Sequence, residues 1–378
     1  MYTTKPLSLF RSQPEAISLL PPPEGQNAGG GYLVVKRATG EDDDEQSCCW
    51  GTCCPGRMLD LPFPQNRVLK VRFQDGGKDG GRYQESVVFV PVAGQPLASN
   101  RYHAVVAKGR RRGLVRACSR EEEHTGTGCF CRSISDVEPR PFDPADVYQQ
   151  IEIVQRRRGW FTARAAAPDG VPSSLYRSKY WQVYEFKQPK KILDLGEALG
   201  LDAAAALRAR RQLAGAFQFQ GATMAGDVGK WYCPFFLVKE HGVAPREQME
   251  RGAFYEVVLE QRWELVLGDA KLAGKKVLIR GSVEAKMEGQ SSGHGDAYVW
   301  FAAATGDRVG VCTTVWEGML WEETRGGWVD DAEELEAGSV ADGSVVLVER
   351  FVVRRMDIRS VAVAFEFVHR NKVKTEQV

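Results

Sequence analysis

The stretch from residue 253 to residue 370 alternates apolar and polar side chains over several long segments. Successive side chains of a β-strand leave opposite faces of the sheet, so a period of two is what a strand with one buried face requires. The pattern therefore predicts an antiparallel β body for the C-terminal third. Its clearest segment has polar residues at 256, 260, 262 and 264 between the mostly apolar positions Tyr255, Val257, Leu259, Gln261, Trp263, Leu265 and Leu267.

Further β segments follow from β-branched and aromatic runs bounded by glycine and proline. In the C-terminal region the expected strands span residues 253–267, 276–287, 297–304, 309–321, 345–356 and 360–369, with a short helix over Pro245–Arg251. In the N-terminal region they span residues 32–35, 68–73, 87–90, 102–108, 113–118, 148–154, 159–164 and 181–186. Helix-forming residues over Leu195–Leu213 predict one helical segment between the two regions.

These elements predict a mainly β (β-rich α+β) fold with two antiparallel regions, each resembling a sandwich or a barrel, joined by one helical segment. We expect an extended N-terminal arm over residues 1–31 and a β-rich region over 32–190. A helical junction over 191–228 and an antiparallel β region over 229–378 complete the predicted organisation.

Composition and charge restrict the cellular setting. The chain has 378 residues and a formal charge of +1, which gives no global attraction to nucleic acid or to anionic membranes. The first residues lack the apolar core of a secretory signal, and no run approaches the roughly 18 apolar residues of a transmembrane helix. The sequence thus predicts an intracellular, cytoplasmic protein without stable membrane insertion, with the nucleus left open.

Several strings of residues, in one order along almost the whole chain, resemble a known family. They include MYTTKPLSLFR, CCWGTC, VPVAGQPLASNRY, CFCRSISDVEPRPFDPADVYQQIEI, VGKWYCPFFLVKE and QMERGAFYEVVLEQRW. With them the chain is similar to a plant-specific uncharacterised family, the domain of unknown function 1262. The resemblance implies a plant protein associated with stress or defence, and it carries over no catalytic residue and no cofactor.

A cluster of cysteines is the sharpest local feature. Thiolates bind Zn²⁺, and a subset of six residues could supply a structural site, although two C-x-x-C knuckles are absent. The alternatives are packed thiols, redox pairs and S-acylated side chains. The candidate ligands are Cys48, Cys49, Cys53, Cys54, Cys129 and Cys131.

Aromatic and basic residues offer candidate binding surfaces. The chain has nine tryptophans, most of which we expect in the core, while Trp321 and Trp328 near expected loops are candidates for ligand stacking. The clusters Arg110–Arg112 and Arg156–Arg158, the second beside Trp160 and Phe161, could contact phosphates and bases. The alternative is a charged hairpin turn and a solvated strand end, and the near-neutral chain argues against a nucleic-acid partner.

No catalytic motif is recognisable in the sequence. The five histidines form no metal-ligand pair, and there is no nucleophile elbow or phosphate-binding loop. We therefore expect a non-enzymatic intracellular binding or scaffolding protein with a protein or small-molecule partner. Two alternatives stay open: a membrane-acting, β-pore-forming (toxin-like) defence protein, and an enzyme whose site is unrecognised.

Overall fold

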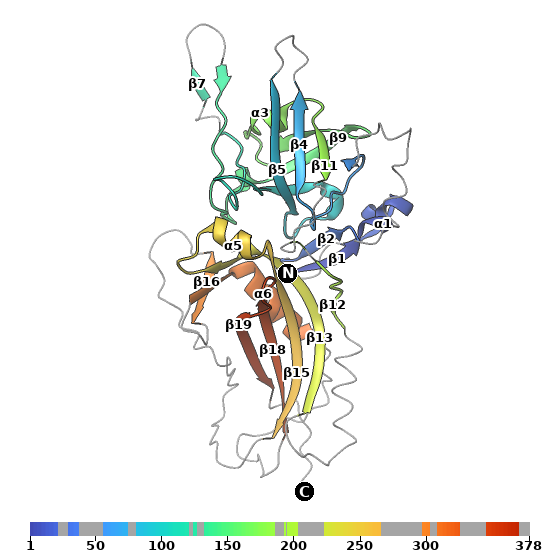
Figure 1. The fold of residues 1–378 in the computed structure, drawn as a ribbon. Coiled ribbons are helices and arrows are strands. Elements are labelled where there is room, and N and C mark those ends of the chain that lie inside the picture. Colours follow the sequence, from blue (N-terminus) through green and yellow to red (C-terminus); the bar gives the residue numbers. More distant parts are fainter. Residues whose placement is uncertain are drawn as a thin grey trace.

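The computed structural model describes residues 1–21, 29–37, 56–74, 81–120, 124–126, 132–185, 193, 195–202, 223–265, 297–302, 308–325 and 345–369. The fold is β-rich, with antiparallel sheets and few helices, which confirms the predicted fold class. Two large sheets occupy the lower and upper halves of Figure 1, and a small sheet lies beside the lower one.

The lower half holds the long sheet, with strand order β19–β18–β15–β13–β1–β2 and β12 paired to β13. Neighbouring strands are antiparallel except β1 and β2, which are parallel. The predicted strands 253–267, 345–356 and 360–369 are confirmed as β15, β18 and β19. The bounds are β1 Tyr2–Pro6, β2 Gly31–Val35, β12 Gly200–Leu201, β13 Thr223–Pro234, β15 Phe254–Leu265, β18 Val345–Arg355 and β19 Val361–His369.

Strand β15 shows how the alternation is used. Tyr255, Val257 and Leu259 face the core and are almost fully buried. On the opposite face Glu256 pairs with Lys230 (2.8 Å), and Glu260 pairs with Arg354 (2.5 Å) on the neighbouring strand. The polar row therefore forms a ladder of cross-strand ion pairs.

The upper half holds the compact sheet, with strand order β10–β9–β6–β5–β4–β11–β3. A bridge between Phe161 in β10 and Trp181, just before β11, brings its two ends together. The sheet thus curls around a core that includes Phe63, Phe89 and Tyr102. The bounds are β3 Arg57–Met58, β4 Leu69–Gln74, β5 Arg82–Pro91, β6 Arg101–Val106, β9 Ile151–Arg157, β10 Trp160–Ala165 and β11 Gln182–Glu185.

The central strands of the compact sheet are buried on both faces. Val87 and Phe89 of β5 face the core enclosed by the curl. Val88 and Val90 of β5 share a second core with Trp231 and other residues of the long sheet. A single apolar core therefore joins the compact sheet to the long sheet.

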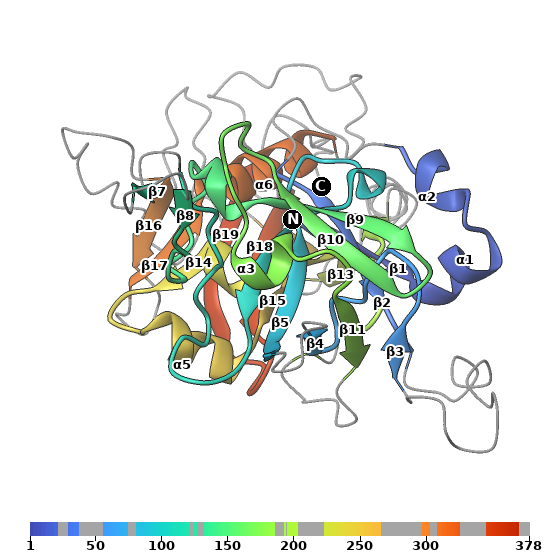
Figure 2. The same cartoon turned by 90° about the horizontal axis from the view of Figure 1, so that it is seen from above.

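The remaining elements surround these sheets (Figures 1 and 2). The small sheet consists of β14 Val238–Glu240, β17 Arg308–Cys312 and β16 Tyr298–Ala302, and β7 His124–Gly126 pairs with β8 Arg132–Ile134. The described α-helices are α1 Leu7–Ser12, α2 Ala16–Leu19, α3 Ser174–Arg177, α5 Pro245–Arg251 and α6 Thr313–Arg325. The short 3₁₀ segments are η3 Leu97–Ser99, η5 Val147–Gln149 and η7 Phe235–Leu237.

A buried ionic network ties the small sheet to the long sheet. Arg355 donates to the Glu240 carboxylate through Nε and through Nη2, each at 2.8 Å. The Tyr255 hydroxyl donates to the same carboxylate at 2.5 Å. Gln248 of α5 donates to the Tyr255 hydroxyl at 2.8 Å. Burial alone would raise the pKa of Glu240, but the hydrogen bonds from Arg355 and Tyr255 outweigh it and lower that pKa.

The turn after β6 contacts α5 and so links the upper and lower halves. Arg112 Nη1 lies 2.9 Å from Glu250 Oε1, and its Nη2 donates to the Met249 carbonyl at 3.3 Å. Gly113 has a φ of +82° and lies against the backbone of Pro245, where a Cβ would collide with the carbonyl. A glycine here satisfies both the positive φ and the close approach.

Five predicted elements need comment. The strand expected over 113–118 is not formed, since Val115 makes only isolated bridges with Val105 and Arg140. The strand expected over 309–321 ends at Cys312, where α6 begins, because Val315, Trp316 and Met319 bury one helical face. The helix expected over Leu195–Leu213 does not begin at Leu195, since residues 195–199 are irregular and β12 follows, while residues 203–213 lie outside the described residues. The expected N-terminal arm contains β1, α1 and α2. The strand expected over 276–287 also lies outside the described residues.

Candidate functional site

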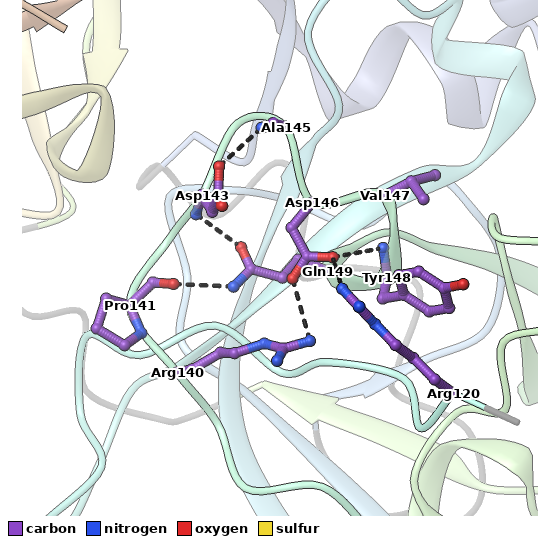
Figure 3. Close-up of a pocket in the computed structure, with 9 residues that line it drawn as sticks. All are labelled: Arg120, Arg140, Pro141, Asp143, Ala145, Asp146, Val147, Tyr148 and Gln149. Atoms are coloured by element: carbon purple, nitrogen blue, oxygen red, sulfur yellow. Dashed lines mark hydrogen bonds and ion pairs between the residues drawn. The ribbon is translucent and has the colours of Figure 1, made fainter. Parts of the chain in front are cut away.

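A pocket of about 370 Å³ opens where the proline-rich crossing after residue 138 reaches the compact sheet (Figure 3). One wall comes from Arg120, which follows the buried Cys118. The other walls come from the crossing itself and from η5. The lining residues are Arg120, Arg140, Pro141, Asp143, Ala145, Asp146, Val147, Tyr148 and Gln149.

Local sequence chemistry shapes the crossing. Asp143 accepts a hydrogen bond from the backbone N–H of Ala145 at 2.9 Å, and Asp146 accepts one from the N–H of Tyr148 at 3.1 Å. Both are turns of the type that aspartate forms with the backbone two residues ahead. Asp146 thereby caps η5 and turns its carboxylate toward the pocket (Figure 3).

Gln149 forms the rigid back of the pocket. Its side chain is buried, accepts from the N–H of Asp143 at 3.0 Å and donates to the carbonyl of Pro141 at 2.8 Å. Its own carbonyl lies 2.9 Å from Nδ1 of His103. Because the Gln149 side chain is buried, its two hydrogen bonds hold the crossing in one conformation.

Two guanidinium groups converge on one carboxylate. Arg140 Nη2 lies 3.1 Å from Asp146 Oδ2, and Arg120 Nη2 lies 3.8 Å from Asp146 Oδ1. The Arg120 guanidinium also lies over the Tyr148 ring, 4.5 Å from its centroid. Within the described part of the chain, the buried Nε and Nη2 atoms of Arg140 make no hydrogen bond. The pocket therefore holds two positioned cations around one carboxylate.

His103 lies behind the pocket and is uncharged at neutral pH. Burial lowers its pKa to about 4, although its hydrogen bond with Gln149 opposes the shift. Its ring packs edge-on against Phe142, with centroids 5.0 Å apart. The histidine is thus a packed residue of the core and does not line the pocket.

The predicted cysteine site cannot be placed. Cys48, Cys49, Cys53, Cys54, Cys129 and Cys131 all lie outside the described residues. In the ranges that the structure describes, no three His, Cys, Asp or Glu side chains come together as metal ligands. Zinc binding by a subset of the six cysteines stays a prediction.

The three cysteines that the structure describes are buried thiols: Cys118, Cys233 and Cys312. Burial raises the pKa of Cys118 and of Cys233 to about 12. Such thiols stay protonated at neutral pH and are poor nucleophiles. These three cysteines therefore behave as small apolar core residues.

The two predicted stacking tryptophans have different outcomes. Trp321 lies in α6 and is half-buried, whereas the sequence placed it at the end of the expected strand 309–321, near a loop. Trp328 lies outside the described residues. Ligand stacking by this pair stays a prediction.

Both predicted basic clusters are partly engaged in structural contacts. Arg111 pairs with Glu138, and Arg112 is bound to α5. Phe161 is fully buried, so it cannot stack on a base. Arg156, Arg157 and Arg158 are exposed at the end of β9. Both clusters therefore present arginines to solvent, with Arg110 and Arg111 exposed in the first.

Sequence reasoning did not identify the pocket. The convergence of Arg120 and Arg140 on Asp146 depends on the tertiary fold. The local signal was Asp146 immediately before the short helical turn η5, which is typical of a capping aspartate.

Comparisons with known proteins give a family match over part of the chain and no activity. Residues 24–130 match the family described as "Protein of unknown function (DUF1262)". No curated protein matches this chain. Among solved structures, "Crystal structure of Cry35Ab1" is similar, with a TM-score of 0.41 and 8% identity over 82% of this chain and 90% of that chain. This chain thus carries a segment similar to an uncharacterised domain.

The helices of the described segments do not provide a membrane span. None of them combines the length and the apolar character that crossing a lipid bilayer requires.

Proposed function

We propose that this chain is a non-enzymatic binding protein whose pocket takes a small ligand carrying a carboxylate or phosphate group. The observation that carries the proposal is the pair of guanidinium groups, Arg120 and Arg140, held around the pocket by Asp146. Arginine donors in a fixed plane match the oxygens of such anions.

The lining residues also support binding over catalysis. They include no cysteine, histidine, serine, threonine or lysine that could act as a nucleophile. The carboxylates of Asp143 and Asp146 already accept backbone hydrogen bonds, and Asp146 is further neutralised by the arginines. These aspartates act as structural groups that position the cations.

The test is a ligand-induced shift of the melting temperature. Wild-type protein should melt at a higher temperature in a concentration-dependent way with at least one member of a panel of phosphates, sugar phosphates and di- and tricarboxylates. Arg140→Gln should need at least tenfold more ligand for the same rise in melting temperature, because the charged donor is lost. The bound compound should be recovered chemically unchanged by mass spectrometry.

The matched control is Arg110→Gln, which removes an exposed arginine from the turn after β6. It should respond to the ligand as wild type does. If no compound of the panel affects wild type, or if Arg140→Gln responds as wild type does, the proposal that the pocket binds an anionic ligand is refuted. Conversion of the compound would refute the non-enzymatic role.

The cellular part of the proposal is an intracellular plant protein with a role in stress or defence. Its support is the match to the uncharacterised family and the motifs that resemble it. Affinity purification from stressed and unstressed plant tissue, followed by identification of bound proteins and small molecules, tests this part. Recovery of the same partners from both tissues would remove the link to stress.

A second candidate is a membrane-acting, pore-forming β protein. Strands β13, β15 and β18 have 12, 12 and 11 residues, which equals or exceeds the roughly 9–11 residues that a tilted strand needs to cross a bilayer. Against it stand the ion pairs of Glu256 and Glu260, which insertion would place in hydrocarbon. Release of a trapped dye from liposomes tests it, and the absence of leakage would dispose of it.

A further inference from the structure

The turn that joins β9 to β10 carries an arginine–aromatic patch separate from the pocket. Trp160 starts β10, and its ring contacts two guanidinium groups, Arg57 at 5.0 Å and Arg157 at 4.7 Å from the ring centroid. Tyr180 packs edge-on against Trp160, with centroids 6.3 Å apart. The arginine–aromatic patch comprises Arg57, Arg156, Arg157, Arg158, Trp160, Lys179 and Tyr180.

The patch is held rigidly. The N–H of Gly159 donates to the carbonyl of Leu59 at 2.6 Å, and Arg57 Nη2 donates to the carbonyl of Gly159 at 2.9 Å. Gly159 has a φ of +74°, which suits the two-residue hairpin turn. The turn is therefore fixed to the segment after β3, and its side chains are displayed in one arrangement.

The patch carries an excess of positive charge at the surface. Arg156, Arg157 and Lys179 are exposed, and no carboxylate of the described chain pairs with them. The nearest acidic partner is Asp60, whose Oδ2 lies 3.4 Å from Nε of Arg158. Such a surface attracts anions, although the whole chain is almost neutral.

The aromatic residues narrow the class of partner. Base stacking by a nucleic acid needs an open ring face. The Trp160 ring is already contacted by two guanidinium groups, and Tyr180 has a third contact, with Arg157 at 5.5 Å. A tryptophan and a 48% exposed tyrosine among arginines instead match the headgroup layer of a membrane, where apolar rings and cationic tips are both accommodated.

The position of the patch also fits a flat partner. The β9–β10 hairpin crosses the face of the molecule that is turned toward the viewer in Figure 2. Side chains on a turn and on the loop before β11 can meet a planar surface together.

We propose that the arginine–aromatic patch binds the surface of an anionic phospholipid membrane peripherally, without insertion of the sheets. The guanidinium and ammonium groups contact lipid phosphates and carboxylates, and Trp160 and Tyr180 lie at the level of the headgroups. This interaction uses no residue of the pocket, so it stands or falls independently of the proposed function.

The experiment is co-sedimentation of the full chain with vesicles of phosphatidylcholine, with and without phosphatidylserine. Wild type should bind only the anionic vesicles, and added salt should weaken binding. The variant Arg156→Gln/Arg157→Gln/Lys179→Gln should bind on the order of a hundredfold more weakly, since each basic residue near the surface contributes roughly fivefold.

The control Arg82→Gln/Arg110→Gln/Arg246→Gln removes the same charge from exposed positions outside the patch. It should keep binding within about twofold of wild type, because the attraction falls off within a Debye length. The double variant Arg156→Gln/Lys179→Gln leaves the stack on Trp160 intact and should lose roughly twentyfold.

Three results would overturn the proposal: no preference for phosphatidylserine, equal loss in the patch and control variants, or tight binding of a single-stranded oligonucleotide without vesicle binding. Dye release by bound wild-type protein would also overturn the peripheral mode. Melting temperatures equal to that of wild type confirm that the variants are folded.

Discussion

At the residue scale, His103 couples the stability of the fold to pH. Its pKa of about 4 in the folded state lies below the ordinary value of 6.5 because the ring is buried. As pH falls, the unfolded chain therefore takes up a proton before the folded chain does. The contribution of His103 is fully present above pH 6.5 and is lost progressively as pH falls from there toward about 4.

Glu322 acts in the opposite sense over the same range. Burial raises its pKa from 4.5 to about 7, so the folded state holds a proton that the unfolded state releases. Its contribution is present below pH 4.5 and is lost as pH rises toward 7. In wild type alone, the opposite pH dependence of Glu322 would therefore mask the contribution of His103 to the free energy of unfolding.

We predict that wild type and His103→Gln differ less in their free energy of unfolding at low pH than at neutral pH. The difference in the free energy of unfolding between the two proteins should shrink by roughly 2 to 3 kcal/mol between pH 7.5 and pH 4.5. Urea unfolding of both proteins at the two pH values measures it. A gap that does not change with pH would contradict a neutral, buried His103.

The residues of the pocket show what sequence can reveal at this scale. The turn at Asp146 follows from local chemistry, because an aspartate hydrogen-bonds to its own backbone two residues ahead. The approach of Arg120 to that aspartate does not, because it depends on how the segment after Cys118 packs beside the crossing. No periodic pattern in the sequence indicates which side chains from distant parts of the chain meet in the fold.

At the scale of elements, the Glu240 network joins β14, α5, β15 and β18. The carboxylate is 7% exposed, and Arg355, its bidentate partner, is 17% exposed. Removing one partner of a buried ion pair leaves the other charge without compensation.

We therefore predict that Glu240→Gln lowers the free energy of unfolding by roughly 3 to 5 kcal/mol. Tyr255→Phe should cost about 1 to 2 kcal/mol, because its hydroxyl joins Glu240 to Gln248. In a double-mutant cycle the two losses should not add, with a coupling of at least about 0.5 kcal/mol. Additive losses would show that the groups do not form one network.

Prediction at this scale succeeded for β15, β18 and β19 and failed for α6, and β13 was not predicted because its first residues were assigned to the helical junction. The run Thr313–Arg325 begins with β-branched residues, which favoured a continuous strand. The buried set Val315, Trp316 and Met319 has helical spacing, and it decides the conformation because burial of that face outweighs propensity. By contrast, Pro245 at the first position of α5 is a local helix signal, and that helix was predicted with the observed bounds.

At the scale of the whole molecule, the compact and long sheets share one apolar core, and the turn after β6 is fixed to α5. We expect the two halves to unfold together. Gly113 and Gly109 offer a matched pair to test this, because their φ values are +82° and +81° but an added Cβ would meet other atoms only at Gly113.

We predict that Gly113→Ala is more destabilising than Gly109→Ala by roughly 1 to 3 kcal/mol. Both changes share the cost of an alanine at positive φ, so the difference isolates the contact with Pro245. Urea unfolding followed by circular dichroism and by tryptophan fluorescence should give one coincident transition in each protein. Equal losses, or two separate transitions, would mean that the halves are energetically independent.

The place of β1 has a consequence for how the protein is made. This strand lies between β2 and β13, and Tyr2 is opposite Tyr232. On the ribosome, the edge of β1 that faces β13 stays unpaired until Thr223–Pro234 has been translated. An unpaired strand edge invites association with other nascent chains. Productive synthesis should therefore depend on a chaperone that shields the first strand until its partner emerges.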